Sequence, residues 1–243
     1  MHYTIGIIGF GSFGRFMASH LLPYANIIAY DPKASATGLE SVTLLQEVDG
    51  LSQAQVIIFA VPLSGLPAAC EQVKNHLRPD ALVIDVTSVK EAPLAILKEH
   101  FPNHALLGTH PIFGPVSGKD GIAGMRIVVC DESCDETKKE KAIAFLRNQL
   151  LLEVIEMTAR EHDEEIACVQ GLTHFIGRAL SAMNIPDSKI ATRSYQHLQD
   201  LVALLKQDSF ELFKTIENGN PYTKEVREEF VTTLKGLEDS LKN

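Results

Sequence analysis

Short apolar runs alternate with amphipathic stretches along the first 157 residues of the chain. The apolar runs cover residues 4–8, 27–30, 56–61, 82–86, 106–107, 125–130 and 152–157. Uninterrupted apolar runs are typical of parallel strands that are buried on both faces. Strands that alternate with helices predict βαβ units. Residues 1–157 are therefore predicted to form an α/β domain with a doubly wound, mostly parallel sheet.

Residues 158–243 follow a different pattern, in which apolar residues recur at helical spacing. One long helix is predicted over 159–183, and three more over 189–207, 209–218 and 223–241, with breaks at Pro186 and Pro221. A helical segment of this size is small for a core of its own, so we expect part of its apolar surface to pack on the first domain or on a second subunit. The prediction is a C-terminal all-helical domain for substrate binding and dimerisation, in a two-fold homodimer.

The first strand leads directly into the glycine motif Gly9-Phe10-Gly11-Ser12-Phe13-Gly14. Between a strand and a helix, the first glycine permits a tight turn, the second lets the backbone approach a pyrophosphate, and the third lets the helix pack on the strand. This context predicts a dinucleotide-binding Rossmann domain rather than a glycine turn without a ligand. The predicted cofactor-binding residues are Gly9, Gly11, Ser12, Phe13, Gly14, Asp31, Val61 and Pro62.

Asp31 bears on the choice of cofactor. It ends the second predicted strand, where a carboxylate accepts hydrogen bonds from a ribose hydroxyl. A 2′-phosphate at this place would meet a like charge, so we predict NAD in preference to NADP. Lys33 and Ser35 follow closely and leave NADP possible.

The charge and composition exclude several classes of partner. The chain of 243 residues carries a net charge of −9, and nucleic-acid binding needs a basic face, so no nucleic-acid partner is expected. A membrane span needs about 18 or more consecutive apolar residues, and none is expected here because no such run is present. The first strand begins close to Met1, which leaves no room for a targeting peptide and predicts a cytoplasmic protein.

The cysteines predict neither a metal site nor disulfides. Cys130 and Cys134 are four residues apart, but no second Cys or His pair stands nearby to complete a zinc site. Cys70 and Cys168 fall in apolar helical surroundings, so both are expected to be buried. A cytosolic chain keeps its thiols reduced.

One histidine stands in the unusual segment Gly108-Thr109-His110-Pro111-Ile112-Phe113-Gly114-Pro115. The prolines restrict the backbone, so we expect a stiff loop that begins after Leu107. Ser88 follows another buried strand, and ligands gather at the carboxyl ends of parallel strands. His110 and Ser88 are therefore expected in one crevice, beside the nicotinamide. The alternatives are an inert surface turn for His110 and a helix cap for Ser88.

The long predicted helix carries a polar row of its own. Gln170 and His174 are four residues apart, and Arg178 continues the same helix face. A polar row on a largely buried helix meets either water or a ligand. A solvated stripe, or a core histidine bonded to a backbone carbonyl, is the alternative to a binding site.

These features resemble the prephenate/arogenate dehydrogenase family over nearly the whole chain. The resemblance rests on the glycine motif, on the segment Ser88-Val89-Lys90-Glu91, on the His110 segment, and on Gln170 with His174. Residues 117–119, 161–163 and 208–213 resemble the plant-type arogenate dehydrogenases more closely. Where common bacterial prephenate enzymes have an Arg-rich segment that binds a substrate carboxylate, this chain has Ser194-Tyr195-Gln196-His197. The partner of that carboxylate is therefore open among Arg193, Lys119 and Arg178.

The resemblance implies oxidative decarboxylation of a cyclohexadienyl substrate, with hydride transfer to a nicotinamide and loss of CO2. Because imidazole has an ordinary pKa of about 6.5, His110 is assigned as the base for the substrate hydroxyl, with Ser88 in support. Asp208 is expected to pair with the ammonium group that arogenate carries and prephenate lacks, unless it only caps a helix. The predicted substrate-binding residues are Gln170, His174, Thr192, Arg193, Asp208 and Lys119.

Other functions stay open beside an arogenate dehydrogenase. Within the family the alternative is a prephenate dehydrogenase. A related Rossmann-type reductase would rely on a lysine or hydroxyl of its helical domain and would not need His110. An NAD(H)-sensing protein would keep the glycine motif and Asp31, and would bind nucleotide without depending on His110. Replacing His110 separates these functions.

Overall fold

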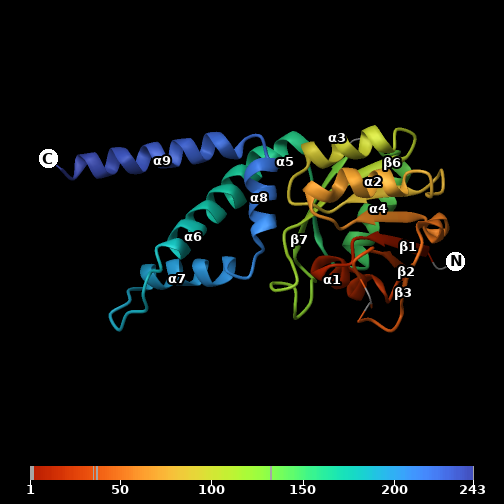
Figure 1. Ribbon diagram of the computed structural model, residues 1–243, viewed down its shortest axis with the longest axis horizontal. Helices are drawn as coiled ribbons and strands as arrows, with labels where there is room; N and C mark the ends of the chain where they lie inside the picture. The colour runs from red at the N-terminus through yellow and green to blue at the C-terminus, as the bar shows by residue number, and fades with distance from the viewer. Residues whose placement is uncertain (1–2, 35, 37, 132, 243) are drawn as a thin grey trace. The chain divides into compact units, whose positions relative to one another are not determined.

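The computed structural model describes residues 3–34, 36, 38–131 and 133–242. The chain divides into two compact units, the first ending at His162 and the second beginning at Asp163 (Figure 1). None of the described helices is both long enough and apolar enough to cross a membrane.

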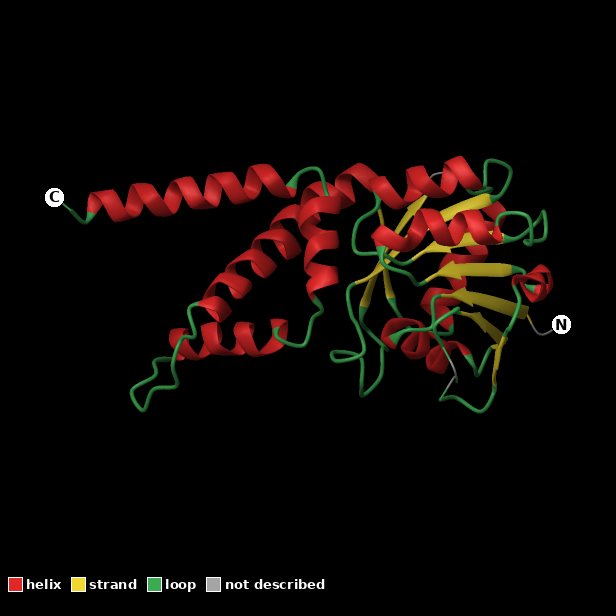
Figure 2. Cartoon of the chain, in the orientation of Figure 1, coloured by secondary structure: helices red, strands yellow, loops and turns green. Residues whose placement is uncertain are grey.

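The first unit is built around an eight-stranded sheet with the order β3-β2-β1-β4-β5-β6-β7-β8 (Figure 2). Every neighbouring pair is parallel except β6 with β7, which is antiparallel. This confirms the predicted doubly wound, mostly parallel sheet. The strands are β1 (Tyr3–Ile8), β2 (Ala25–Tyr30), β3 (Val42–Leu44), β4 (Val56–Phe59), β5 (Leu82–Asp85), β6 (Ala105–Pro111), β7 (Arg126–Asp131) and β8 (Glu153–Glu156).

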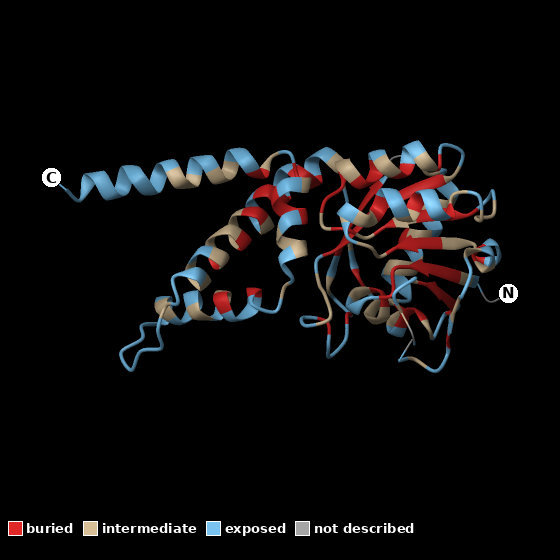
Figure 3. Ribbon diagram, viewed as in Figure 1, coloured by how far each residue is buried: buried red, intermediate tan, exposed pale blue. Residues whose placement is uncertain are grey.

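Helices cover both faces of this sheet, which explains why its central strands are mostly apolar. The helices of the first unit are α1 (Ser12–Leu21), α2 (Leu66–Val73), α3 (Glu91–His100) and α4 (Glu136–Asn148), with short 3₁₀ turns at Val48–Gln53 and Leu63–Gly65. On one face, α2 and α3 pack on the side chains of Ile57, Val83 and Leu106. On the other face, α1 and α4 pack on separate groups of strand residues. The buried residues follow the strands (Figure 3).

An apolar cavity of about 960 Å³ lies on the sheet face that α1 and α4 cover. Thr109 and Pro111 of β6 are among the residues that line it. Successive side chains of a strand point to opposite faces, so His110 points to the face covered by α2 and α3. The cavity and the His110 imidazole are therefore on opposite sides of the sheet.

The second unit is helical, as predicted, and the helix that leads into it contains a π-helical turn. The helix expected over 159–183 consists of α5 (Ala159–Ile166), a π-helical turn η3 (Ala167–Leu172) and α6 (Thr173–Ala182). It is followed by α7 (Arg193–Leu205), α8 (Phe210–Gly219) and α9 (Thr223–Ser240). A Cβ on Gly171 would lie only 2.6 Å from Thr223 Cγ2, so η3 packs closely on the start of α9. Such π turns occur frequently at functional sites.

The cysteines are only partly as expected. Cys70 is buried, but Cys168 in η3 is exposed, so the prediction that Cys168 is buried was wrong. The π turn alters the winding of the helix, and a position inferred from regular 3.6-residue spacing is then misplaced.

Candidate active site

The predicted catalytic and cofactor-binding residues of the first unit gather at one edge of the sheet. The register pairs Ile8 with Phe59, Phe59 with Asp85, and Asp85 with Gly108, so β1, β4, β5 and β6 run level across the sheet. The glycine motif therefore follows β1 at the same edge where His110 lies near the end of β6. This is the edge at which open α/β sheets bind ligands.

The glycine loop has the shape that a pyrophosphate needs. Gly9 has φ +90°, and a Cβ there would lie 2.6 Å from the Ala60 carbonyl oxygen. A Cβ on Gly14 would collide with the carbonyl oxygen of Gly9. Beside Gly11, by contrast, no atom of the described chain lies within 4 Å of a Cβ position, and this glycine stands at the N-cap of α1. The open approach to a helix N-terminus fits a bound dinucleotide phosphate.

The Asp31 carboxylate accepts hydrogen bonds from two loops at this edge, the glycine loop and the loop that follows β2. It accepts the Phe10 N–H at 2.8 Å and the Lys33 N–H at 2.9 Å. Arg15 places its guanidinium 5.3 Å from the centre of the Phe10 ring and donates to the Ala36 carbonyl. The carboxylate thus stands directly beside the glycine loop, as a ribose ligand must.

The other predicted cofactor residues surround this loop. Ser12 and Pro62 are exposed, and Phe13 and Val61 are half-buried. Ser35 lies outside the residues that the structure describes.

His110 lies inside strand β6 and is buried, with 3% of its surface exposed. The expected stiff loop after Leu107 is therefore wrong in this part. Antiparallel pairing with β7 extends the strand to Pro111 and sets His110 opposite Val128. The alternative of an inert surface turn is excluded by the burial.

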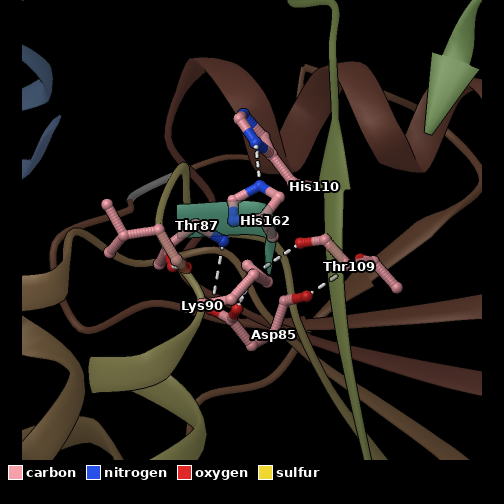
Figure 4. Close-up of polar contacts among 7 residues, drawn as sticks. Asp85, Thr87, Lys90, Thr109, His110 and His162 are labelled. Atoms are coloured by element: carbon pink, nitrogen blue, oxygen red, sulfur yellow. Dashed lines mark hydrogen bonds and ion pairs between the residues drawn. The ribbon is translucent and has the colours of Figure 1, made fainter. Parts of the chain in front are cut away.

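The His110 imidazole has a second histidine as its partner. His110 Nδ1 and His162 Nε2 are 2.8 Å apart, and the two rings meet at 72° (Figure 4). His162 comes from the first turn of α5 and is 1% exposed. Two buried imidazole nitrogens at this distance share one proton in a hydrogen bond.

A buried ion pair lies beneath the same segment of β6. The Lys90 ammonium bonds the Asp85 carboxylate and donates to the Thr109 carbonyl at 2.6 Å (Figure 4). Both charged side chains are fully buried. Thr109 in turn donates its hydroxyl to the Asp85 carbonyl at 2.8 Å. A Cβ on Gly108 would lie 3.2 Å from Lys90 Cδ, so Gly108 leaves room for the lysine stem.

These surroundings determine the charge of His110. Burial lowers the pKa of the His110 imidazole well below its ordinary value of 6.5, and the neighbouring His162 and the Lys90 ammonium lower it further. The imidazole is therefore neutral at pH 7. A neutral imidazole is the form that accepts a proton as a general base.

Ser88 lies half-buried in the loop between β5 and α3. The helix begins at Glu91 with Lys90 at its N-cap, so the alternative that Ser88 caps this helix is wrong. Thr87 holds the loop, because its N–H donates to Asp85 Oδ1 and its hydroxyl donates to the Val89 carbonyl.

The second unit contains its own polar cluster around His174. His174 Nε2 lies 3.8 Å from Asp208 Oδ2, and His174 Nδ1 is buried without a hydrogen-bond partner among the described residues. Arg178 donates to the backbone carbonyls of Asp208 at 2.6 Å and Ser209 at 3.3 Å. Burial lowers the pKa of His174, while Asp208 raises it and Arg178 lowers it. A ligand group that hydrogen-bonds to this buried nitrogen would satisfy it.

Asp208 does not cap α8. That helix begins at Phe210, and its N-cap is Ser209, whose hydroxyl accepts the Leu212 N–H at 3.0 Å. The capping alternative for Asp208 was therefore wrong, and its carboxylate faces His174 instead.

The remaining predicted substrate residues occupy separate places. Thr192 caps α7 by accepting the Tyr195 N–H at 3.2 Å, and Arg193 begins that helix with an exposed side chain. Gln170 lies in η3. Lys119 is exposed in the connection between β6 and β7 of the first unit.

Sequence reasoning missed His162 and the pair of Asp85 with Lys90. One signal for His162 was present, the capping box that Thr158 and Glu161 form at the start of α5. It fixes the beginning of the helix immediately after β8, and so fixes where His162 stands. No local pattern indicates that His162 meets His110, 52 residues earlier.

Comparison with known proteins identifies the family. A model described as "Prephenate dehydrogenase, nucleotide-binding domain" matches residues 24–150, and one described as "TYRAAT1-like, C-terminal domain" matches residues 179–243. Chloroplastic arogenate dehydrogenases 1 and 2 of Arabidopsis thaliana are 30% and 29% identical over 98% of this chain. The chain spans 39% and 69% of their respective lengths. Because these relatives are chloroplastic, the cytoplasmic location stays a prediction.

A solved structure shares the fold. The prephenate dehydrogenase from A. aeolicus, in complex with hydroxyphenyl propionate and NAD+, matches 99% of this chain and 91% of its own with a TM-score of 0.79 and 19% identity. The family model over residues 24–150 covers more than half of the 243 residues, and the chain belongs to the prephenate dehydrogenase family.

Proposed function

We propose that this chain oxidises L-arogenate with NAD and releases CO2 to give L-tyrosine. The observation that carries the proposal is His110, a buried imidazole with a lowered pKa at the sheet edge where the glycine loop and Asp31 stand. Family membership supports the same reaction class. Two of the relatives matched in sequence are arogenate dehydrogenases.

In the proposed reaction, the hydride goes to the cofactor and residues of the first unit handle the proton of the substrate hydroxyl. NAD, when bound at the glycine loop, supplies the hydride acceptor. His110 accepts the proton of the substrate hydroxyl, and Ser88 supports that hydroxyl or the imidazole. The carbonyl that forms drives loss of the ring carboxylate as CO2, since the ring becomes aromatic. NAD is preferred over NADP because the Asp31 carboxylate repels a 2′-phosphate.

The second unit supplies recognition of the amino-acid tail. The Asp208 carboxylate pairs with the arogenate ammonium, and His174 and Gln170 orient the substrate. Thr192 stands with Arg193 at the start of α7. Arg193 and Lys119 are the cations proposed for the substrate carboxylates, because Arg178 is engaged by the carbonyls of residues 208 and 209.

The second unit is also proposed to form a homodimer. Leu234, Leu237 and Leu241 are exposed at or just beyond the end of α9, at intervals of three and four residues. An apolar stripe of this spacing fits the same stripe on a second copy. Sedimentation of the full chain gives the mass that decides between monomer and dimer.

Initial rates test the function directly. They are measured with L-arogenate and with prephenate, each with NAD and with NADP. The proposal expects the highest kcat/KM for arogenate with NAD. A preference for prephenate would keep the family reaction and refute the role of Asp208, and absence of turnover with either substrate would refute the proposed function.

Asp208→Asn tests substrate choice. The amide keeps the size of the side chain but loses the charge that pairs with the ammonium, so kcat/KM for arogenate should fall by about 10- to 100-fold. The activity with prephenate should rise relative to arogenate, because the repulsion of its carboxylates is removed. Asp200→Asn, at an exposed carboxylate of α7, is the matched control and should leave the ratio unchanged. An unchanged ratio in Asp208→Asn would contradict the pairing.

A further inference from the structure

The two buried histidines of the first unit form a pair, of which the proposed reaction uses only His110. His110 Nδ1 faces His162 Nε2 at 2.8 Å, and both side chains are almost completely buried. A neutral imidazole carries its proton on one ring nitrogen only, and the partner of the other nitrogen decides which one. The hydrogen bond between the rings therefore sets the tautomer of the catalytic base.

We propose that His162 is a positioning residue that accepts a hydrogen bond from His110 Nδ1–H and thereby makes His110 Nε2 the proton-accepting atom. The proposal rests on the proposed function and deepens it. If His162 donated instead, His110 Nδ1 would be the acceptor, and its lone pair would be occupied by His162. Only the first arrangement leaves the basic lone pair of His110 on the nitrogen that points away from His162.

In this arrangement each bond broken in the proton transfer is matched by a bond formed. The substrate O–H bond breaks and a bond from the proton to His110 Nε2 forms, while the electron pair of the O–H bond becomes part of the new carbonyl. His110 then holds protons on both nitrogens. Its Nδ1–H still donates to His162 Nε2, so this buried N–H keeps its hydrogen-bond partner during the transfer.

The position of His162 is fixed independently of the site. Thr158 and Glu161 form reciprocal hydrogen bonds at the start of α5, with Thr158 N–H to Glu161 Oε2 at 2.8 Å and Glu161 N–H to Thr158 Oγ1 at 3.1 Å. The His162 N–H then donates to the Thr158 carbonyl at 3.0 Å. A side chain held on a capped first turn presents its ring in a defined place.

Two substitutions separate hydrogen bonding from packing. His162→Gln keeps an acceptor oxygen close to the place of Nε2, whereas His162→Leu has similar bulk and no acceptor. We expect kcat to fall by about 10- to 100-fold in His162→Leu, with NADH affinity unchanged, and to recover most of its value in His162→Gln. His76→Leu, at a histidine that pairs with Asp49, is the matched control.

The pH profile gives a readout that a purely structural role would not move. Among the described residues, the titratable groups that lower the pKa of His110 are His162 from α5 and Lys90 from the turn before α3, with Asp85 of β5 paired to Lys90. His162 lowers the pKa of His110, so its removal should move the acid limb of kcat/KM to higher pH in both variants.

Nitrogen NMR of the full chain, with ¹⁵N-labelled histidine, tests the tautomer without any substrate. Wild type and His162→Gln should show His110 protonated at Nδ1, and His162→Leu should lose that preference. The proposal is overturned if wild-type His110 is protonated at Nε2, or if His162→Leu keeps wild-type kcat and pH profile, or if His162→Gln is as impaired as His162→Leu. If the wild type turned over neither substrate, only the proposed function would fail, since the NMR result stands by itself.

Discussion

Replacing His110 with asparagine should reduce kcat by about 10²- to 10⁴-fold, the range that a general base contributes. Asparagine approximates the place of Nδ1 and can still donate to His162, so the strand and the pair contact are preserved as far as possible. It has no basic nitrogen to accept the substrate proton. Affinity for NADH should stay within a few-fold, because the nucleotide site proposed at the glycine loop and Asp31 does not include His110.

Steady-state rates and NADH fluorescence titration measure these two effects separately. His76→Asn, at a histidine that pairs with Asp49 elsewhere in the first unit, is the control for a general loss of stability. Lost turnover with unchanged nucleotide binding supports an enzyme that uses His110 as its base. Unchanged turnover in His110→Asn would assign the base to another group. A wild-type chain that binds NADH but turns over no substrate would favour the sensor function.

The lowered pKa of His110 also predicts how the stability of the fold depends on pH. The unfolded chain binds a proton at His110 near pH 6.5, whereas the folded chain, in which the pKa is lowered, binds it only at lower pH. The neutral form in the fold is therefore a source of stability that is complete above pH 6.5 and is lost as the pH falls toward the folded pKa. Activity and stability are therefore both expected to fall as the pH is lowered below 6.5.

The layout of the fold follows from the sequence because its signals are local. Most of the parallel strands contain a short apolar run, and these runs are followed by a turn or a helix start that the residues themselves specify. Gly9 and Gly14 belong to this class, because the strand, glycine turn and helix that contain them are consecutive in the sequence, although the Ala60 carbonyl that crowds Gly9 comes from the end of β4. Such positions are found without knowing the tertiary structure.

The errors arise where distant segments decide local structure. The strand was expected to end at Leu107, yet pairing with β7 extends β6 to Pro111, which the register sets opposite Ile127. Ser209 rather than Asp208 caps α8, a difference of one residue that a preference shared by Ser and Asp does not resolve. The π turn η3 and the contact of His110 with His162 likewise depend on packing between segments.

The buried pair of Lys90 and Asp85 was beyond sequence reasoning for the same reason. Lys90 lies in the mostly polar segment Ser88-Val89-Lys90-Glu91, which is typical of an exposed helix start. In the structure its ammonium is fully buried. It pairs with the Asp85 carboxylate at the end of β5 and donates a hydrogen bond to the Thr109 carbonyl of the neighbouring strand β6. A charged residue that is this deeply buried is held by partners or is not tolerated.

Lys90→Met should therefore lower the free energy of unfolding by about 3–5 kcal/mol, the cost of leaving one member of a buried ion pair without its partner. Methionine has a similar length and no charge, so the change tests the ammonium rather than the volume. Urea unfolding, followed by circular dichroism at pH 7, measures the effect. A loss of less than about 1 kcal/mol would contradict the interpretation.

The double variant Asp85→Asn/Lys90→Met distinguishes the pair from the lysine alone. With both charges removed no uncompensated charge is buried, so the double variant should be more stable than Lys90→Met. It also tests the link to the base. Since the Lys90 ammonium lowers the pKa of His110, its loss should move the acid limb of kcat/KM to higher pH even where stability recovers. A recovered fold with an unshifted acid limb would mean that Lys90 acts on the architecture of β6 and not on the charge of His110.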